Sequence, residues 1–349
     1  MNYIESRNDF LRDIHSVYSH DISNFVCSLA DLPDLQRISQ VSKNGGVEYS
    51  CFNTMAYKYT LLDHSFGVAI ILEKFKQSRP HIIEAMFHEL ASPSFGKSIE
   101  YLKEYFNKED YESPAFEDCL VSKDLLFEGV SSSEFNVTDC ANFKDYVLGF
   151  ADFPKLSAEN LEYIFTNAYF SGLCDLHEIE AMYSKVSICK NEDIVDEFCF
   201  TDPERAFEFF KLSIEVGKIN RSYEAKITRR LISDVLMLMV RREEIYFDDL
   251  YKYSDKGIIN IGEECSDKRI QEGWQEVLSL DKVDLKFTPT ADKSKYCVKT
   301  EEKSIYVDPL IRTKNGIFRL SKVDERVEEE LDKYFSSDTD MFMQIDYEL

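Results

Sequence analysis

The sequence is poor in positive charge. Its 349 residues include 41 Lys and Arg against 65 Asp and Glu, which gives a formal net charge of −24 at pH 7. A surface this acidic repels the phosphate backbone of DNA and RNA, so the composition excludes nonspecific nucleic-acid binding. A local basic pocket that takes a single nucleotide is still compatible with this composition.

The sequence also lacks long hydrophobic runs and paired cysteines. No apolar run approaches the roughly 20 residues that span a bilayer, and the opening residues MNYIESRNDFLRDIH contain no signal-peptide core. The nine cysteines are scattered singly, with no C-x-x-C pair, which argues against a disulfide framework or a zinc ribbon. We therefore expect a reduced, cytoplasmic protein with no membrane partner.

Residues that interrupt helices are scarce, with 12 Gly and 8 Pro against 26 Phe and 20 Tyr. This composition favours long packed helices. Residues 66–75 are apolar nearly all round, which predicts a buried helix, and Pro80 predicts the start of a second helix over 80–90. Apolar residues at helical spacing predict a third helix near 96–107. Ser157 is a good N-cap and predicts the start of another amphipathic helix.

The pattern changes after about residue 284. Residues 295–300 and 304–308 alternate like strands, and Asn315-Gly316 is a hairpin turn signal. A last amphipathic helix is predicted near 322–335.

The predicted fold is therefore mainly α. We expect a helical domain over residues 1–283, with a motif core over 30–175, followed by a small C-terminal α+β lobe and acidic tail over 284–349.

Two histidines and two acids stand at expected helix ends. His64 opens the buried helix, His88 and Glu89 close the next one, and Glu159 lies in the first turn after Ser157. Imidazole nitrogens and carboxylate oxygens together suit a divalent metal. Neighbouring residues on a helix diverge by about 100°, so His88 and Glu89 would both reach a metal lying beyond the helix end. The alternative is that both histidines are packing residues and both acids are solvated.

Four segments of the chain occur in a recognisable order. They are Leu35-Gln36-Arg37-Ile38 with Asn44-Gly45-Gly46, His64-Ser65-Phe66-Gly67-Val68-Ala69, Phe87-His88-Glu89 with Ser92-Pro93-Ser94-Phe95-Gly96-Lys97, and Glu159-Asn160-Leu161-Glu162-Tyr163. In this order they resemble the motifs of the HD-domain phosphohydrolase superfamily, and within it the deoxynucleotide triphosphohydrolase-like branch. With weaker similarity further along, the resemblance spans roughly residues 30 to 335.

The resemblance implies a metal-dependent mechanism on an HD-type helical core. Family members hold a divalent metal that activates water for attack on a phosphate. Position by position, the implied ligands of Mn, Mg, Fe, Ni or Zn are His64, His88, Glu89 and Glu159.

The same resemblance implies roles around the metal. Glu100 and Lys97 are the expected catalytic residues, and Arg37, Lys43 and Tyr163 are the expected substrate contacts. The implied ligand is a nucleotide or another phosphorylated small molecule, and family analogy implies a homo-oligomer.

The chain departs from the family at several of these positions. Both carboxylate ligands are Glu rather than Asp, and the extra methylene moves each carboxylate by about 1–1.5 Å, comparable to a misplacement that costs about 100-fold in rate. Four positions that bind or protonate phosphate in the family hold Leu61, Ser92, Lys97 and Asn160 here.

Two readings follow from the altered motif. The first is a phosphohydrolase with a changed pocket, in which Lys97, Arg37 or Lys43 meets the phosphate as a point charge. The second is a pseudoenzyme, a catalytically inactive HD fold that serves as a nucleotide-binding or protein-interaction module.

Overall fold

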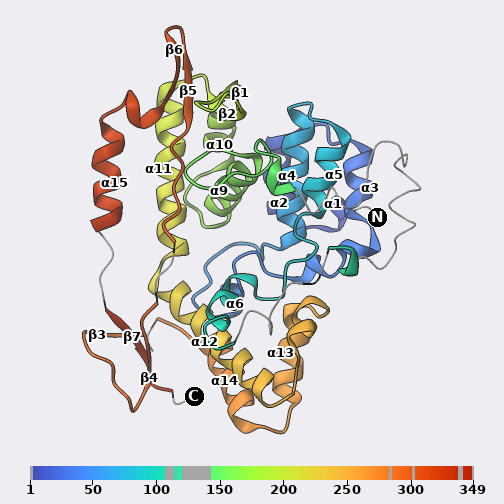
Figure 1. Cartoon of the computed structure of the whole chain (residues 1–349), viewed down its shortest axis with the longest axis vertical. Helices are drawn as coiled ribbons and strands as arrows, with labels where there is room; N and C mark the ends of the chain where they lie inside the picture. Colours follow the sequence, from blue (N-terminus) through green and yellow to red (C-terminus); the bar gives the residue numbers. More distant parts are fainter. Residues whose placement is uncertain are drawn as a thin grey trace.

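The computed structural model describes residues 3–106, 114, 116–119, 143–282, 285–300, 303–336 and 341–347, and these residues are mainly helical (Figure 1). The predicted mainly α fold class is confirmed. No helix in these ranges is long and apolar enough to cross a bilayer. Residues 337–340, which belong to the predicted acidic tail, lie outside the described residues.

A first group of helices surrounds a large apolar core. These helices are α1 (Tyr3–Ser6), α2 (Asp9–Tyr18), α3 (Asn24–Ala30), α4 (Leu61–Lys74), α5 (Arg79–Phe87), α9 (Ala158–Phe170), α10 (Leu176–Tyr183), α11 (Pro203–Asn220) and α15 (Arg326–Ser336). Helix α4 is central, because it contacts α2, α3, α5 and α9 (Figure 1). Its residues 61–72 are all buried, as its apolar sequence predicts.

The N-terminus of α4 is set by a capping box. The Thr60 side chain accepts a hydrogen bond from the backbone N–H of Asp63, and Asp63 accepts one in return from the Thr60 backbone. The helix therefore starts at Leu61, five residues before the predicted start of the apolar run at 66. This earlier start places His64 in the first turns of α4.

A second group of helices has its own core around the buried indole of Trp274. It consists of α6 (Gly96–Leu102), α12 (Tyr223–Arg241), α13 (Asp255–Glu264) and α14 (Lys268–Ser279). Short 3-10 helices connect the two groups or lie beside them: η1 (Pro33–Leu35), η2 (Ile38–Gln40), η3 (Val47–Tyr49), η5 (Phe116–Cys119), η6 (Phe143–Asp145), η7 (Phe247–Tyr251) and η8 (Leu320–Lys322).

The strands form two small sheets. One has the order β1-β2-β5-β6, from β1 (Val186–Lys190), β2 (Asp196–Phe200), β5 (Leu310–Thr313) and β6 (Gly316–Arg319). The other has the order β3-β7-β4, from β3 (Lys286–Thr288), β4 (Tyr296–Val298) and β7 (Phe342–Ile345), and is antiparallel. The predicted turn at Asn315-Gly316 joins β5 to β6, with Gly316 at a positive φ of 136°.

Residues 284–349, expected as one C-terminal lobe, are divided between these two sheets. Strand β5 pairs in parallel with β2, more than 100 residues earlier, whereas β3, β4 and β7 pair with one another (Figure 1). Burial explains the division. Val307 and Tyr334 belong to the first core, whereas Tyr296 and Met343 belong to the second.

Candidate metal centre

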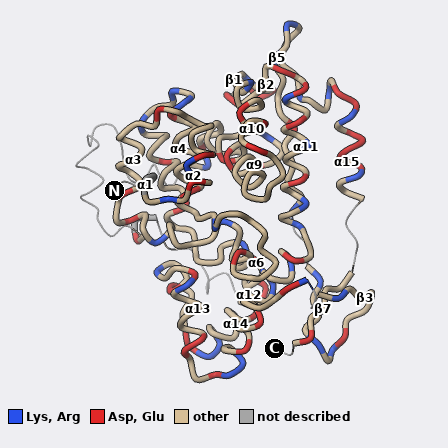
Figure 2. The backbone as a smooth tube through the Cα atoms, turned by 180° about the vertical axis from the view of Figure 1, so that it is seen from behind, with Lys and Arg blue, Asp and Glu red and all other residues tan. Residues whose placement is uncertain are grey.

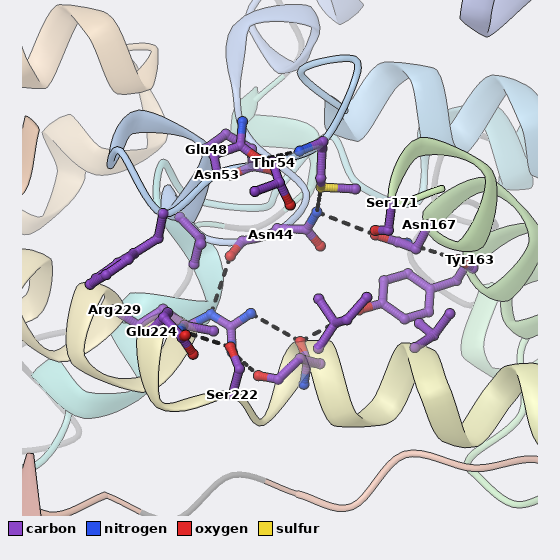
Figure 3. Close-up of a pocket in the computed structure, with 17 residues that line it drawn as sticks. Asn44, Glu48, Asn53, Thr54, Tyr163, Asn167, Ser171, Ser222, Glu224 and Arg229 are labelled. Atoms are coloured by element: carbon purple, nitrogen blue, oxygen red, sulfur yellow. Dashed lines mark hydrogen bonds between the residues drawn. The ribbon is translucent and has the colours of Figure 1, made fainter. Parts of the chain in front are cut away.

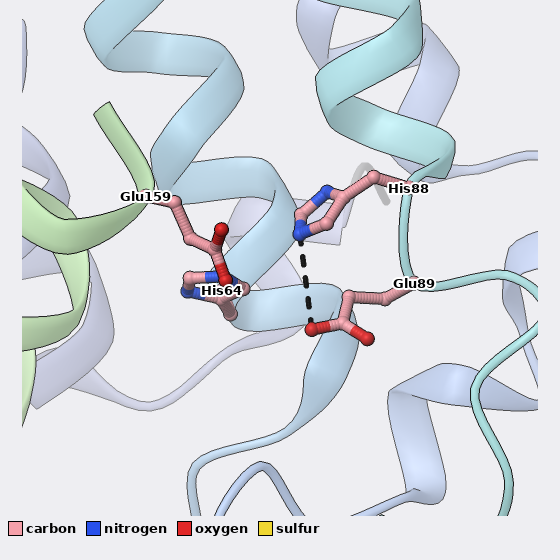
Figure 4. Close-up of side chains that lie close together, drawn as sticks. All are labelled: His64, His88, Glu89 and Glu159. Carbon is pink, nitrogen blue, oxygen red and sulfur yellow. Dashed lines mark ion pairs between the residues drawn. The ribbon is translucent and has the colours of Figure 1, made fainter. Parts of the chain in front are cut away.

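Four side chains from three parts of the chain meet at one point (Figure 4). His64, His88, Glu89 and Glu159 each offer one donor atom, and these atoms all lie within 4.8 Å of one another. His64 comes from α4, Glu159 from the first turn of α9, and His88 and Glu89 from the turn that ends α5. We call these four residues the metal cluster.

The end of α5 lets two adjacent residues face the same point. The helix stops at Phe87, and the chain then turns, with the backbone N–H of Leu90 donating to the carbonyl of Phe87 and that of Ser92 donating to Glu89. Arg37 Nη2 donates to the carbonyls of Leu90 (2.8 Å) and Ser92 (2.7 Å). Arg37, predicted as a substrate contact, therefore holds the turn that carries the ligands.

Both imidazoles have one nitrogen engaged and the other turned toward the cluster. His64 Nδ1 lies 2.5 Å from Glu162 Oε2, and His88 Nδ1 donates to the carbonyl of Ala85 at 2.6 Å. The two Nε2 atoms and Glu159 Oε2 are buried and have no hydrogen-bond partner within the described residues. Buried polar atoms without partners are costly, so three such atoms around one point mark a place for a bound group.

Glu162 orients His64 from behind. Its carboxylate is fully buried and accepts hydrogen bonds from the Tyr59 hydroxyl and, at 2.7 Å, from Thr166 Oγ1. A carboxylate on the far nitrogen of a histidine is a common support for a metal ligand, because it sets the tautomer and the ring orientation. Sequence reasoning missed this role. The signal was present, since Glu162 follows Glu159 by three residues and so shares its helix face.

The charges in the cluster are interdependent. Burial disfavours ionisation of Glu89, but Lys43 together with His88 and His64 outweighs it and holds the pKa of Glu89 well below its usual range. Burial likewise opposes protonation of His64, but Glu162 and Glu159 raise its pKa. Burial lowers the pKa of His88, which keeps that imidazole neutral and able to ligate.

Lys43 lies at the edge of the metal cluster. Its Nζ is 2.5 Å from Glu89 Oε1 and 3.8 Å from Glu159 Oε1. Burial acts to lower the pKa of Lys43, but these two carboxylates raise it overall, so the ammonium stays charged. The predicted substrate contact is therefore close to the predicted ligands.

Lys97 and Tyr163 are also brought together. Lys97 Nζ donates to the Tyr163 hydroxyl at 3.0 Å and to Asn220 Oδ1 at 3.1 Å. Lys97 lines a cavity with Ser42, Lys43, Glu89, Ser92 and Lys103, which we call the metal-side cavity. Glu100 stands at its rim, where its exposed carboxylate accepts a hydrogen bond from Lys103 at 2.8 Å. The structure therefore does not bring Glu100 into the metal cluster.

A second pocket has Tyr163 in its wall (Figure 3). We call it the amide pocket, because its wall includes Asn44, Asn53, Asn167 and Asn220, together with Tyr163 and Arg229. The buried Arg229 guanidinium donates to the carbonyl of Asn44 at 3.2 Å and to Asn220 Oδ1 at 2.9 Å. Sequence reasoning gave Tyr163 as a substrate contact and placed Asn44 in the first motif segment, but it did not bring these residues together in one pocket, because they come from segments far apart in the chain.

Asp255 connects α13 to both lysine-bearing segments. Its fully buried carboxylate accepts the backbone N–H of Ser42 at 2.8 Å and that of Phe95 at 3.0 Å. Lys43 and Lys97 follow these two residues in the chain. Asp255 therefore fixes the backbone from which both ammonium groups reach the metal-side cavity.

Comparisons with known proteins show the fold and no more. No family model matches the sequence, and no curated protein matches it. Among solved structures, a hypothetical protein from Aquifex aeolicus is similar, with a TM-score of 0.56 and 13% sequence identity over 93% of this chain and 93% of that chain. At this identity the likeness concerns the arrangement of the elements alone.

Proposed function

We propose that this chain is a metal-dependent phosphohydrolase of the HD type, acting on a nucleotide or another phosphate ester. The observation that carries the proposal is the convergence, beside the carboxylate of Glu89, of three buried atoms that have no hydrogen-bond partner among the described residues: His64 Nε2, His88 Nε2 and Glu159 Oε2. The order of the four motif segments supports the HD assignment.

The donors fit a divalent cation of borderline hardness. Two neutral nitrogens and two carboxylates favour Mn, Fe, Ni or Zn over a purely oxygen-liganded ion, with Mg the hardest of the candidates. Both histidines have a second partner that sets the ring orientation, as metal ligands do. A bound cation would supply Lewis acidity toward a phosphoryl oxygen and toward water.

The residues around the cluster suit a phosphate. Lys43 and Lys97 present ammonium groups along the metal-side cavity, where they neutralise phosphoryl oxygens. Tyr163 and the amides of the amide pocket lie next to Lys97, in the right place to hold the organic part of the same ligand. Ser92, which replaces a family histidine, donates its hydroxyl to Glu89 and so helps to fix that carboxylate.

The test combines metal content with turnover. Protein purified without chelator should contain close to one divalent metal per chain and should release phosphate from at least one member of a nucleotide panel with Mn, Mg, Fe or Ni. The variants His88→Ala and Glu89→Gln should lose both properties. The exposed His20 and Glu104 allow matched controls, His20→Ala and Glu104→Gln, which should keep both. Turnover that survives Glu89→Gln would place the chemistry elsewhere.

One observation favours a second candidate function. Lys43 Nζ already gives Glu89 and Glu159 a cationic neighbour, so the chain can balance these acids without a metal. In that case the fold would serve as a catalytically inactive nucleotide-binding or protein-interaction module. Its signature is thermal stabilisation by a nucleotide with no product and no bound metal, because a ligand that binds only the folded state raises stability.

A further inference from the structure

A third cavity lies outside the proposed metal site and is lined by cations. Arg7 precedes α2, Lys58 belongs to the loop before α4, and Lys256 lies in the first turn of α13. Three segments that are distant in sequence thus each place a positive side chain around one hollow. We call it the basic cavity. It shares Ser42 with the metal-side cavity, from which it is otherwise distinct.

The cations of this cavity are only partly compensated. Neither Lys58 nor Lys256 forms an ion pair with a residue that the structure describes, whereas Arg7 pairs with the buried Asp63 at 3.0 Å. Arg7 Nε is nevertheless buried without a hydrogen-bond partner in the described ranges. Among the described lining residues, Glu48 is the sole carboxylate, and it already accepts the Ser42 hydroxyl.

This balance is unusual for a chain with a net charge of −24. Lys and Arg positions are scattered among Asp and Glu positions along the backbone (Figure 2), whereas the wall of this cavity has three cations and one carboxylate among its described residues. Two unpaired ammonium groups beside a guanidinium attract a group with two negative charges more strongly than one with a single charge.

The other lining residues indicate what kind of molecule would carry the anionic group. The hydroxyls of Ser39, Ser42 and Thr60 already donate to the Gln36 carbonyl, to Glu48 and to Asp63, so the cations are the groups left to meet an anion. The rings of Tyr49 and Tyr57 form part of the wall, and Lys58 Nζ lies 4.7 Å from the centre of the Tyr49 ring. Cations and flat apolar rings together suit a small phosphorylated molecule whose organic part lies against the tyrosines.

We propose that the basic cavity is a second anion site, separate from the metal cluster, which binds the phosphate group of a small molecule through Arg7, Lys58 and Lys256. The site goes beyond the proposed hydrolase function and does not depend on it. Arg7 also connects the site to the metal cluster, because its partner Asp63 immediately precedes His64 in α4.

The experiment measures pyrophosphate binding by calorimetry to the full chain stripped of metal with a chelator, at near-physiological ionic strength. The absence of metal separates this site from any hydrolase activity. The double variant Lys58→Ala/Lys256→Ala should weaken binding by about tenfold or more, since two charge-assisted contacts are lost. Both side chains lie at the surface, so the variant keeps the core packing.

The matched control is Lys103→Ala, which removes a lysine from the metal-side cavity instead. It should leave pyrophosphate affinity in the metal-free protein unchanged. The proposal is overturned if the double variant binds like the wild type, if Lys103→Ala abolishes binding, or if the metal-free wild type binds no pyrophosphate. Any of these results leaves the proposed hydrolase function to its own test.

Discussion

Gly67 lies directly against Glu162, so closely that the Glu162 side chain fits only because Gly67 has no side chain. A Cβ built on Gly67 would approach Glu162 Cγ to 2.7 Å and Oε1 to 2.8 Å. Both residues are fully buried, and Glu162 Oε2 is the atom that meets His64 Nδ1. The glycine of the second motif thus makes space for the carboxylate that orients the first histidine.

Gly67→Ala should therefore disturb the metal cluster without touching a ligand. The methyl group displaces Glu162, and loss of such an outer support costs about 10–100-fold in metal affinity. Overpacking in the core should also lower the free energy of unfolding by about 1–3 kcal/mol. Metal titration and denaturant unfolding measure the two effects. Gly96→Ala is the control, because a Cβ at that position meets no atom of the described residues within 4 Å beyond its own chain neighbours and helix backbone, and it should change neither quantity.

Asp255 should make stability depend on pH in an unusual direction. Burial raises the pKa of Asp255 to about 7, although the N–H groups of Ser42 and Phe95 act to lower it. The folded state therefore holds a proton that the unfolded state releases near the ordinary Asp value. Stability from this group is highest at low pH and falls as pH rises toward about 7, by at most about 1.4 kcal/mol per pH unit.

The variant Asp255→Asn should remove this pH dependence while keeping the side-chain shape. The difference in unfolding free energy between wild type and variant should change between about pH 4 and pH 7, the range between the ordinary Asp pKa and the raised one. Asp248→Asn, at an exposed position on η7, should run parallel to the wild type. A constant difference across that range would show that Asp255 is ionised throughout.

His15 should act on stability in the opposite direction over much of the same pH range. It is fully buried beside the rings of Tyr18 and Phe66, and burial lowers its pKa to about 3. The unfolded chain takes up a proton near pH 6.5, so stability is lost as pH falls below that value. The loss between pH 7 and pH 4 should be about 3 kcal/mol.

His15→Leu should abolish that acid-induced loss, because the variant has no imidazole to protonate. Unfolding curves at pH 7 and pH 4 give the comparison, and the exposed His20→Leu is the control. If His15→Leu and the wild type lose equal stability on acidification, His15 takes up its proton in the folded state as readily as in the unfolded chain, and its pKa is not lowered by burial.

The sequence indicated those parts of the site that depend on local signals. His64, His88 and Glu159 each stand at a helix end, where a cap or a turn residue in the sequence reveals the geometry. The amide pocket and Asp255 had no such signal. Asn220 meets Lys97 across 123 residues, and Asp255 meets Ser42 across 213 residues. Contacts of this kind depend on how the two cores pack against each other. Neither helical periodicity nor capping residues predict that packing.

The division of the C-terminal strands has the same origin. Of the two alternating segments after 284, residues 295–300 contain β4, whereas residues 304–308 form no strand, so that prediction was wrong; Asn315-Gly316 correctly indicated a hairpin turn. Alternation of apolar and polar residues indicates that one face of a strand is buried, but it does not indicate which core that face packs against. Strand β5 joined β2 because Leu310 and Ile311 align with Cys199 and Phe200, a parallel pairing that no short-range pattern predicts.

A substitution of Lys43 distinguishes most clearly between the two candidate functions, the hydrolase and the inactive binding module. The Lys43 ammonium competes with a metal for Glu89 and Glu159, yet in a hydrolase it would also neutralise the phosphate. Lys43→Met keeps the apolar stem of the side chain, shortens it by one atom and removes the charge. It should therefore raise metal affinity by about tenfold, the size of one charge-assisted contact, while turnover of any nucleotide substrate falls.

The Lys43→Met variant is useful because metal affinity and turnover are expected to change in opposite directions. Metal affinity is read by competition with a chelating dye, and turnover by phosphate release at saturating metal. Lys103→Met, at the rim of the same cavity, should change neither by more than a small factor, because that lysine pairs with the exposed Glu100. If metal affinity falls together with turnover, Lys43 supports the ligands rather than competing for them. If the wild type binds no metal and Lys43→Met gains it, the ammonium is the resident cation of an inactive site.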